Sequence, residues 1–295
     1  MSATEKPILD LRRQIDEIDA ALQDLIIRRT SVVEEIAHLK DNGAAPANHL
    51  PAREAQVVRR LVQRHHGPFP KAALVRMWRE MISALVRLQG PFAVAVYAPE
   101  EHPGYWDLAR DHYGSQTPIT AHGSTAQVVR AVTEGIAAVG VLPIPDQDDS
   151  DSWWRGLVGS EPKLPRVIGR LPFGAAGTLR GDPSDALVIG VIPYEGSGHD
   201  RSLLVLETQR EISRSALKAT LSGLGFDPAL LQVWRDQAGS GLWLYLLEIA
   251  GYSLADDPRL ARLAEEHRGE ITRVWRIGGY AVPLAADELG LAKRG

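Results

Sequence analysis

The N-terminal stretch of the chain shows the hydrophobic pattern of one long amphipathic helix. No glycine or proline occurs between Ile8 and Asp41, and apolar residues recur at steps of three and four. They form a heptad seam of two rows: Ile8, Ile15, Leu22 and Ile36 in one, and Leu11, Ile18, Leu25, Val32 and Leu39 in the other. The pattern predicts a helix whose apolar face packs against another helix.

Arg29 stands in the first row of this seam, where an apolar residue would continue the pattern. An arginine keeps its charge when it is buried, so Arg29 needs an anion opposite it. That anion is either a bound small molecule, or Glu34 or Glu35 of a second copy. Lys40 lies about 16 Å further along and returns to nearly the same helical face, so both cations can converge on one ligand.

Arg12 lies roughly 25 Å from Arg29 on the same helix, a gap that a ligand under about 10 Å long cannot bridge. Arg12 therefore either reaches the site of a second copy of the chain or is a solvated residue at the start of the helix. The first alternative predicts a homodimer in which Arg12 acts in trans. The apolar seam favours it, because a monomer would leave the seam exposed.

Two further helices are expected after a break at Asn42-Gly43. One runs from Pro51 to about His65, and the next follows a Gly/Pro-rich stop and covers residues 71–89. The apolar stripe of the last helix consists of Leu74, Trp78, Met81, Ile82 and Leu85. Gln89 continues this stripe, so it either delivers an amide into the same pocket or simply ends the helix.

Beyond Gly90, apolar runs of strand length alternate with helical patterns, which predicts a small α/β layer with parallel strands. From Arg201 onward the order is strand, helix, strand, strand, helix, strand, the order of a ferredoxin-like unit. The glycine-rich pieces Gly174–Gly177 and Gly196–Gly198 are interpreted as loops, with a phosphate cradle as the alternative.

Composition narrows the class of protein. The chain has 295 residues, 24% of them charged, and a net charge of −4, which suits several globular segments and not a protein that coats nucleic acid. There is no cysteine, and the nine histidines show no metal-binding spacing, so no metal and no cofactor is expected. No apolar run approaches the ~18 residues of a membrane span, and the N-terminus lacks a signal peptide's apolar core, so we expect a cytoplasmic protein without a membrane partner.

Several motifs of the first 90 residues resemble the all-helical class of chorismate mutase. They are LRRQIDEID, the pair Arg28-Arg29, Leu39-Lys40, Ala52-Arg53-Glu54 and WREMISALVRLQ. The resemblance implies that the substrate is chorismate and that no cofactor takes part.

The resemblance also implies a role for each candidate residue. Arg12 matches the arginine that reaches the substrate of the neighbouring subunit, and Arg29 matches the one that binds a carboxylate within its own subunit. Lys40 matches the lysine on the ether oxygen and a carboxylate. Gln89 matches the amide that faces the same oxygen.

Arg53 and Glu54 match an Arg-Glu pair whose glutamate holds the ring hydroxyl of the substrate. Two departures from the family pattern stand near it. Residues 49–52 replace a segment that often carries an acidic residue, and Leu85 stands where a small hydroxyl side chain is common.

The rest of the chain resembles prephenate dehydratase followed by an ACT regulatory domain. Gly140–Ile144 resembles a dehydratase strand, but the T-R-F signature appears only as Asp200-Arg201-Ser202, and residues 143–147 replace P-I-E-N-S. In the ACT-like part, the phenylalanine-binding stretches appear only as residues 215–217 and 234–237. We therefore expect no dehydratase activity.

The predicted fold is multidomain, α and α/β. A three-helix chorismate mutase domain with a long first helix covers residues 1–90, and a reduced, periplasmic-binding-like α/β domain of dehydratase type covers residues 91–199. A ferredoxin-like βαββαβ ACT domain covers residues 200–285, and a tail follows at 286–295. The predicted function is chorismate mutase. The alternatives are a bifunctional chorismate mutase/prephenate dehydratase and an inactive regulatory protein of the same pathway.

Overall fold

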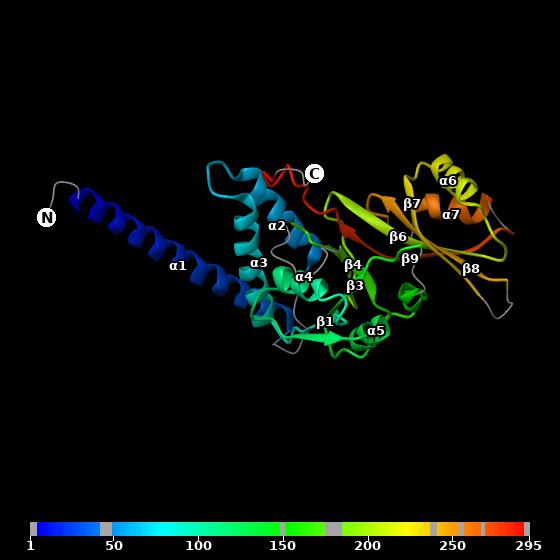
Figure 1. The fold of residues 1–295 in the computed structure, drawn as a ribbon, viewed down its shortest axis with the longest axis horizontal. Coiled ribbons are helices and arrows are strands. Elements are labelled where there is room, and N and C mark those ends of the chain that lie inside the picture. Colours follow the sequence, from blue (N-terminus) through cyan, green and yellow to red (C-terminus); the bar gives the residue numbers. More distant parts are fainter. Residues whose placement is uncertain are drawn as a thin grey trace. The chain divides into compact units, whose positions relative to one another are not determined.

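The computed structural model describes residues 5–41, 49–147, 151–174, 185–236, 241–253, 257–266 and 269–291. Figure 1 shows the helices and strands of these ranges along the chain. Two compact units can be distinguished by their internal packing. The first unit comprises residues 1–49 and 84–91, and the second unit comprises residues 50–83 and 92–295.

Helix α1 (Glu5–Asp41) belongs to the first unit and confirms the predicted long helix. It runs for 37 residues because no glycine occurs in it and Pro7 lies in the first turn, where its missing N–H leaves no intrahelical hydrogen bond unmade. The hydroxyls of Thr30 and Ser31 donate to carbonyls four residues earlier, which satisfies these polar side chains within the helix. The expected stop at Asn42-Gly43 lies outside the described residues, but the last helical residue, Asp41, directly precedes it.

Helices α2 (Pro51–Arg64) and α3 (Lys71–Leu88) confirm the two further helices. Pro51 occupies the first turn of α2, where its missing N–H is not needed. Glu54 lies in the same turn, where a negative charge stabilises the helix N-terminus.

The predicted stripe of α3 is only partly right. Ile82 and Leu85 are buried as expected, but Leu74, Trp78 and Met81 are half-buried. The other buried residues of α3 are Val75, Arg79, Ser83 and Val86. The prediction counted apolar side chains alone, whereas the buried face also carries polar groups that find partners in the folded chain.

The α/β part begins with β1 (Val94–Tyr97), α4 (Gly104–Tyr113), β2 (Ile119–His122), α5 (Thr125–Thr133) and β3 (Val139–Pro143). Strand β1 pairs in parallel with both β2 and β3, as predicted. Helix α5 begins with a capping box, in which Ser124 accepts from the backbone of Gln127 and the side chain of Gln127 accepts from the backbone of Ser124.

Two strands of this part were missed from the sequence. They are β4 (Arg166–Leu171) and β5 (Ala186–Gly190), which follow the short 3-10 helix η1 (Trp153–Leu157). Both of their pairings with neighbouring strands of the α/β part are antiparallel, β3 with β5 and β4 with β5, so the expectation of parallel pairing holds only for β1, β2 and β3. Both strands are short, and their register depends on β3 and on each other, so no local pattern in the sequence marks them.

The C-terminal part confirms the ferredoxin-like order. It contains β6 (Asp200–Thr208), α6 (Arg214–Gly223), β7 (Pro228–Arg235), β8 (Trp243–Ala250), α7 (Pro258–Glu266) and β9 (Ile271–Ala281). Strand β6 lies between β9 and β8, β7 forms the edge, and all three pairings are antiparallel.

Within the described residues, the α/β part and the ferredoxin-like part share one sheet of nine strands, in the order β2-β1-β3-β5-β4-β9-β6-β8-β7. Alternate residues of β6 pack into two different hydrophobic clusters. Leu204 and Leu206 pack in a cluster with residues of α6 and α7, whereas Leu203 and Val205 pack in a cluster with Trp154 of η1. The packing therefore continues across the predicted domain boundary near residue 200.

Helix α2 is part of the same body. Its buried residues cluster with α3, with a loop after β4 and with the C-terminal segment: Ala55, Val58, Val62, Val75, Phe173, Ala281, Leu284 and Leu289. Arg59 of α2 donates to the Ser197 hydroxyl at 2.9 Å and to the carbonyls of His199 and Val282, each at 2.8 Å. Burial lowers the pKa of Arg59, and the nearby carboxylate of Asp200 opposes this effect.

None of the helices in the part of the chain that the structure describes is both long and apolar enough to cross a lipid bilayer.

Candidate functional site

The six candidate residues divide between the two units. Arg12, Arg29, Lys40 and Gln89 belong to the first unit, and Arg53 and Glu54 belong to the second. Their elements are α1, the segment directly after α3, and the first turn of α2.

Arg29 combines a charge with partial burial. Its Nη1 atom is buried and has no hydrogen-bond partner among the described residues. Desolvation lowers the pKa of this guanidinium. A buried guanidinium N–H without a partner is costly, and a carboxylate is the group that satisfies it best. The local structure around Arg29 therefore suits the anion-binding role that the sequence suggested.

The other candidate residues of the first unit lie on α1 and directly after α3. Arg12 is exposed on α1. Lys40 lies in the last turn of α1, and its side chain is outside the described part of the structure. Gln89 follows the last residue of α3, and its Nε2 donates to the carbonyl of Leu85 at 3.1 Å, so this amide satisfies a carbonyl at the end of the helix.

In the second unit, Arg53 is exposed and Glu54 is held by a neighbour. The carboxylate of Glu54 accepts a hydrogen bond from Nη1 of Arg79 at 2.9 Å. The side chains in this ion pair are only 12% and 6% exposed, respectively. The pair joins the first turn of α2 to the middle of α3.

Arg79 was not singled out from the sequence. It lies inside the WREMISALVRLQ motif but off the apolar stripe, so a pattern of hydrophobic residues alone assigns it to solvent. Its guanidinium lies over the ring of Phe173, 5.0 Å from the centroid. Desolvation lowers the pKa of Arg79, and Glu54 opposes the shift. The sequence signal that could have pointed to Arg79 was Glu54, because a carboxylate on a buried helix face requires a cation as its partner.

Tyr113, the last residue of α4, completes the surroundings of this ion pair. It is buried, and its pKa is raised first by desolvation and then by the charge of Glu54. The phenol therefore stays neutral beside the carboxylate. Leu85, one of the two departures from the family pattern, is buried, and so is His49 in the other.

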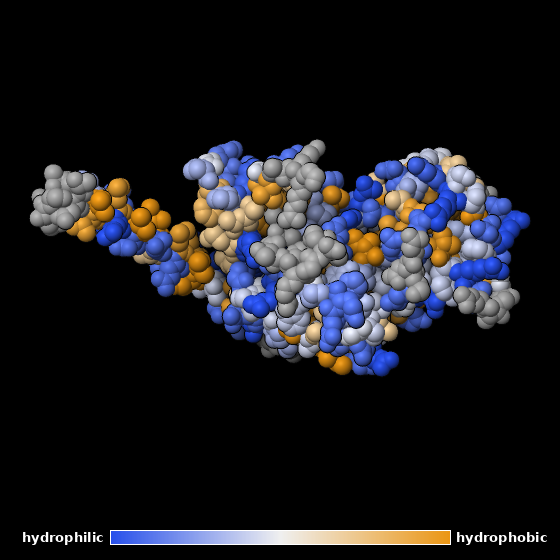
Figure 2. Space-filling view, in the orientation of Figure 1, coloured by the Kyte–Doolittle hydropathy of each residue, from blue (hydrophilic) through white to orange (hydrophobic). Residues whose placement is uncertain are grey.

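The predicted seam of α1 is exposed along its full length. Each of its nine apolar residues exposes at least 41% of its surface, and Leu25 exposes 60%. Figure 2 shows hydrophobic residues gathered along this helix. So large an apolar surface is rare on a single soluble chain and marks an interaction surface.

The glycine-rich loop before β6 does not offer a phosphate cradle. The backbone N–H groups of Ser197 and Gly198 donate to the carboxylate of Asp200, at 2.9 and 3.0 Å, so the chain's own anion occupies this turn. The interpretation as a loop agrees with this geometry for Gly196–Gly198. Of the other piece, only Gly174 lies within the described residues.

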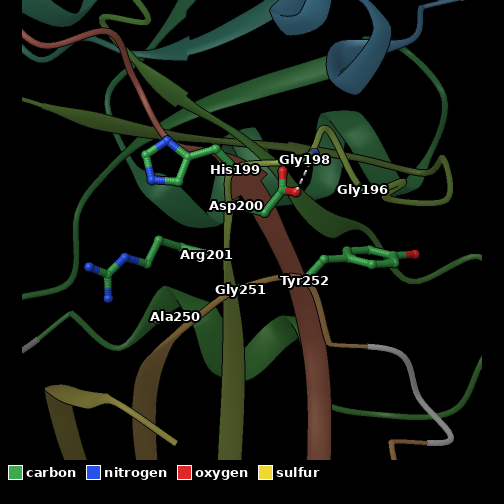
Figure 3. A pocket seen from close by; sticks show the side chains of 8 residues that line it. All are labelled: Gly196, Gly198, His199, Asp200, Arg201, Ala250, Gly251 and Tyr252. Carbon is green, nitrogen blue, oxygen red and sulfur yellow. Dashed lines mark hydrogen bonds between the residues drawn. The ribbon is translucent and has the colours of Figure 1, made fainter.

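A hollow of about 410 Å³ lies next to this loop, between the start of β6 and the end of β8. Figure 3 shows His199 and Arg201 on one side of β6, and Asp200 and Tyr252 on the other. Arg201 approaches Glu248 to 3.7 Å and Asp227 to 4.0 Å, so carboxylates of the chain already compensate its charge. We assign no ligand to this hollow.

By its fold, the chain combines a helical N-terminal segment with a mixed α/β and ferredoxin-like body. Residues 11–90 match the family described as chorismate mutase type II. The N-terminal helical segment is therefore a chorismate mutase type II domain, and all six candidate residues fall within the matched range.

Relatives with this domain are bifunctional. The chain is 30% identical over 148 residues to the bifunctional chorismate mutase/prephenate dehydratase of Pseudomonas aeruginosa, an alignment that covers 48% of this chain and 40% of that protein. It is 29% identical over 140 residues to the protein of the same name from Stutzerimonas stutzeri, covering 45% of this chain and 38% of that protein. These alignments exceed the matched domain in length, which supports the fused architecture, but they span only about 40% of the relatives.

Solved structures show a weaker likeness. A quorum-quenching acylase, GqqA, has a TM-score of 0.47 at 13% identity, covering 66% of this chain and 96% of its own. Prephenate dehydratase from Streptococcus mutans has a TM-score of 0.45 at 13% identity, covering 65% of this chain and 99% of its own. Similarity this low transfers no activity to this chain.

Proposed function

We propose that the protein is a chorismate mutase, which converts chorismate to prephenate in the biosynthesis of aromatic amino acids. The observation that carries this proposal is the match of residues 11–90 to the chorismate mutase type II family, with every candidate residue inside it. The buried Nη1 of Arg29, which has no hydrogen-bond partner among the described residues, supports it, because the substrate is a dianion.

The reaction suits these residue types. One C–O bond of the substrate breaks while one C–C bond forms within the same molecule, so no nucleophile, proton transfer, metal or cofactor is required. The protein has to hold the substrate in its compact shape and stabilise the negative charge that grows on the ether oxygen.

Each candidate residue then has a definite task. Arg29 and Arg53 bind substrate carboxylates, and Arg12 does so from a second copy of the chain. Lys40 and Gln89 donate to the ether oxygen, where preorganised donors lower the barrier.

Glu54 accepts a hydrogen bond from the ring hydroxyl of the substrate. A carboxylate can accept about four hydrogen bonds, so its ion pair with Arg79 is compatible with this task.

The functional form is proposed to be a homodimer in the cytoplasm. The exposed seam of α1 supports this assembly, because a heptad seam is buried when two such helices pair. A dimer would also bring Arg12 to the site of the partner, consistent with its exposure on α1.

A second candidate is a bifunctional chorismate mutase/prephenate dehydratase. The names of the relatives favour it, whereas the altered T-R-F and P-I-E-N-S positions of this chain favour a mutase alone. The third candidate, an inactive regulatory protein, rests on Leu85 and the altered segment 49–52.

Consumption of chorismate by the purified protein is the first test. The wild type is expected to consume chorismate and to yield phenylpyruvate only after acid treatment, which converts prephenate to phenylpyruvate without an enzyme. Lys40→Ala is expected to lower kcat by about 100- to 1000-fold, the usual cost of one preorganised donor. Lys218→Ala, an exposed lysine on α6, is the matched control and is expected to retain full activity.

Two outcomes would change the assignment. Phenylpyruvate formed without acid would establish the bifunctional enzyme. A folded protein that consumes no chorismate would exclude both enzymes and leave the regulatory protein.

A further inference from the structure

Arg79 has no role in the function proposed so far, although it touches one of the candidate catalytic residues. Its side chain is 6% exposed and its Nη1 atom lies 2.9 Å from Oε2 of Glu54. A cation this close favours the ionised form of a carboxylate and restricts its rotamers. The contact therefore acts on both the charge and the position of Glu54.

The α/β part holds Arg79 in place. The ring of Phe173, in the loop after β4, lies 5.0 Å from the Arg79 guanidinium, and Phe173 is buried in the cluster that also contains Val75, one turn earlier on α3. Tyr113, at the end of α4, borders the pair as a neutral group. Arg79 thus meets a carboxylate from α2 and the ring of Phe173 from the α/β part.

We propose that Arg79 is a positioning residue for Glu54: it keeps the Glu54 carboxylate ionised and oriented to accept the hydrogen bond of the substrate's ring hydroxyl. The inference rests on the proposed mutase function. It gives the α/β part a task in catalysis, because Phe173 packs against the arginine that positions Glu54.

The two charged residues of α3 nearest to Arg79 in the sequence have partners of their own, whereas Arg53, next to Glu54, is exposed. Arg76, one turn before Arg79 on α3, pairs with Asp111 of α4 at 2.6 Å. Glu80, the next residue after Arg79, accepts from the backbone and the hydroxyl of Ser115. Arg76 is therefore a control with the same residue type, the same helix and its own ion pair.

The test compares two substitutions that separate charge from shape. Arg79→Gln retains a hydrogen-bond donor for Glu54 and removes the charge. The plot of kcat/KM against pH has an acidic limb, the fall in activity as Glu54 becomes protonated. In Arg79→Gln the midpoint of this limb is expected to rise by about one pH unit or more, because the carboxylate has lost its neighbouring cation. Arg79→Lys retains the charge and loses the planar fork, so its limb is expected to stay near that of the wild type while kcat/KM falls by up to about 100-fold through misplacement of Glu54.

Controls link the shift to Glu54. Arg76→Gln is expected to leave the acidic limb unchanged. In a Glu54→Gln background, which has no carboxylate at this position, Arg79→Gln is expected to produce no further shift. A folded Arg79→Gln protein with the wild-type limb would overturn the proposal. So would failure of both Arg79 variants to fold, since that assigns Arg79 to the fold alone.

A stability measurement separates this inference from the proposed function. The free energies of unfolding of Arg79→Gln, Glu54→Gln and the double variant form a cycle that measures the coupling of the pair without any substrate. If the wild type consumes no chorismate, the proposed function fails regardless of this coupling. If the wild type is active and the pair is coupled in stability but the pH limb does not move, the positioning role alone is wrong.

Discussion

Gly278 illustrates how one residue can join two parts of this molecule. It lies in β9 with a φ of +129°, at the position where β9 meets β4 opposite Val167. A Cβ atom built at Gly278 would lie 2.1 Å from the carbonyl oxygen of Val167 and 2.5 Å from its backbone nitrogen. Only glycine permits this backbone conformation together with so close an approach, so Gly278 allows the two halves of the sheet to become continuous.

Substitution of Gly278 by alanine is therefore expected to destabilise the fold strongly. We expect Gly278→Ala to lower the free energy of unfolding by about 3 kcal/mol or more, because both the conformation and the contact become unfavourable. Chemical denaturation monitored by tryptophan fluorescence would measure this loss.

Gly223→Ala is the matched control for that experiment. Nothing lies within 4 Å of a Cβ added at this residue, which is the last of α6. The variant is expected to be as stable as the wild type or slightly more stable. Equal effects of the two substitutions would contradict the close packing at Gly278.

At the scale of the element, α1 carries two patterns on one helix. Its heptad seam supplies an apolar surface, and Arg12, Arg29 and Lys40 supply the positive charges that are proposed to bind the substrate. The seam is exposed in the single chain, although residues of this kind are normally buried. Pairing of the seam with a second copy would bury it and would make the helix both the dimer interface and part of the site.

A charge on the seam is expected to prevent this pairing. Leu25→Glu should convert a dimer to a monomer, because it places a carboxylate in the middle of an apolar interface. Sedimentation equilibrium measures the change, with circular dichroism to show that helix is retained. Gln23→Glu, an exposed substitution off the seam, should leave the dimer intact. A folded wild-type monomer at micromolar concentration would rule out the proposed assembly.

At the scale of the whole molecule, α2 and most of α3 belong to the body that contains the sheet. The apolar cluster of α2 includes Phe173 from the loop after β4 and Leu284 and Leu289 from the C-terminal segment. Arg59 adds three hydrogen bonds from α2 to residues around β6 and β9. The predicted mutase domain therefore shares its core with the rest of the chain.

A chain that ends at Gly90 is accordingly expected to fold poorly. It would leave Val58, Val62 and Val75 without their partners, and the exposed apolar surface would favour aggregation. Thermal unfolding followed by circular dichroism should show a cooperative transition for the full chain and a broad one for the shortened chain. A cooperative transition of similar midpoint in both would show that residues 1–90 are an independent domain.

The sequence predicted most elements of this chain because their signals are local. The heptad rows of α1, the proline at the start of α2 and the alternation of strands and helices after Gly90 each act over a few residues. The same holds for the six candidate residues, which were found by their types and spacing within short motifs. Their roles toward chorismate remain predictions.

Only the tertiary structure decided which distant segments meet. Strands β4 and β5, the shared sheet at Gly278 and the partner of Glu54 depend on residues far apart in the sequence. Arg79 shows the reason most clearly. Its burial is stable because Glu54, 25 residues earlier, and Phe173, from the loop after β4, meet it in the folded chain. The sequence by itself determined the helices and their charges, whereas long-range packing determined which of those charges are paired and buried.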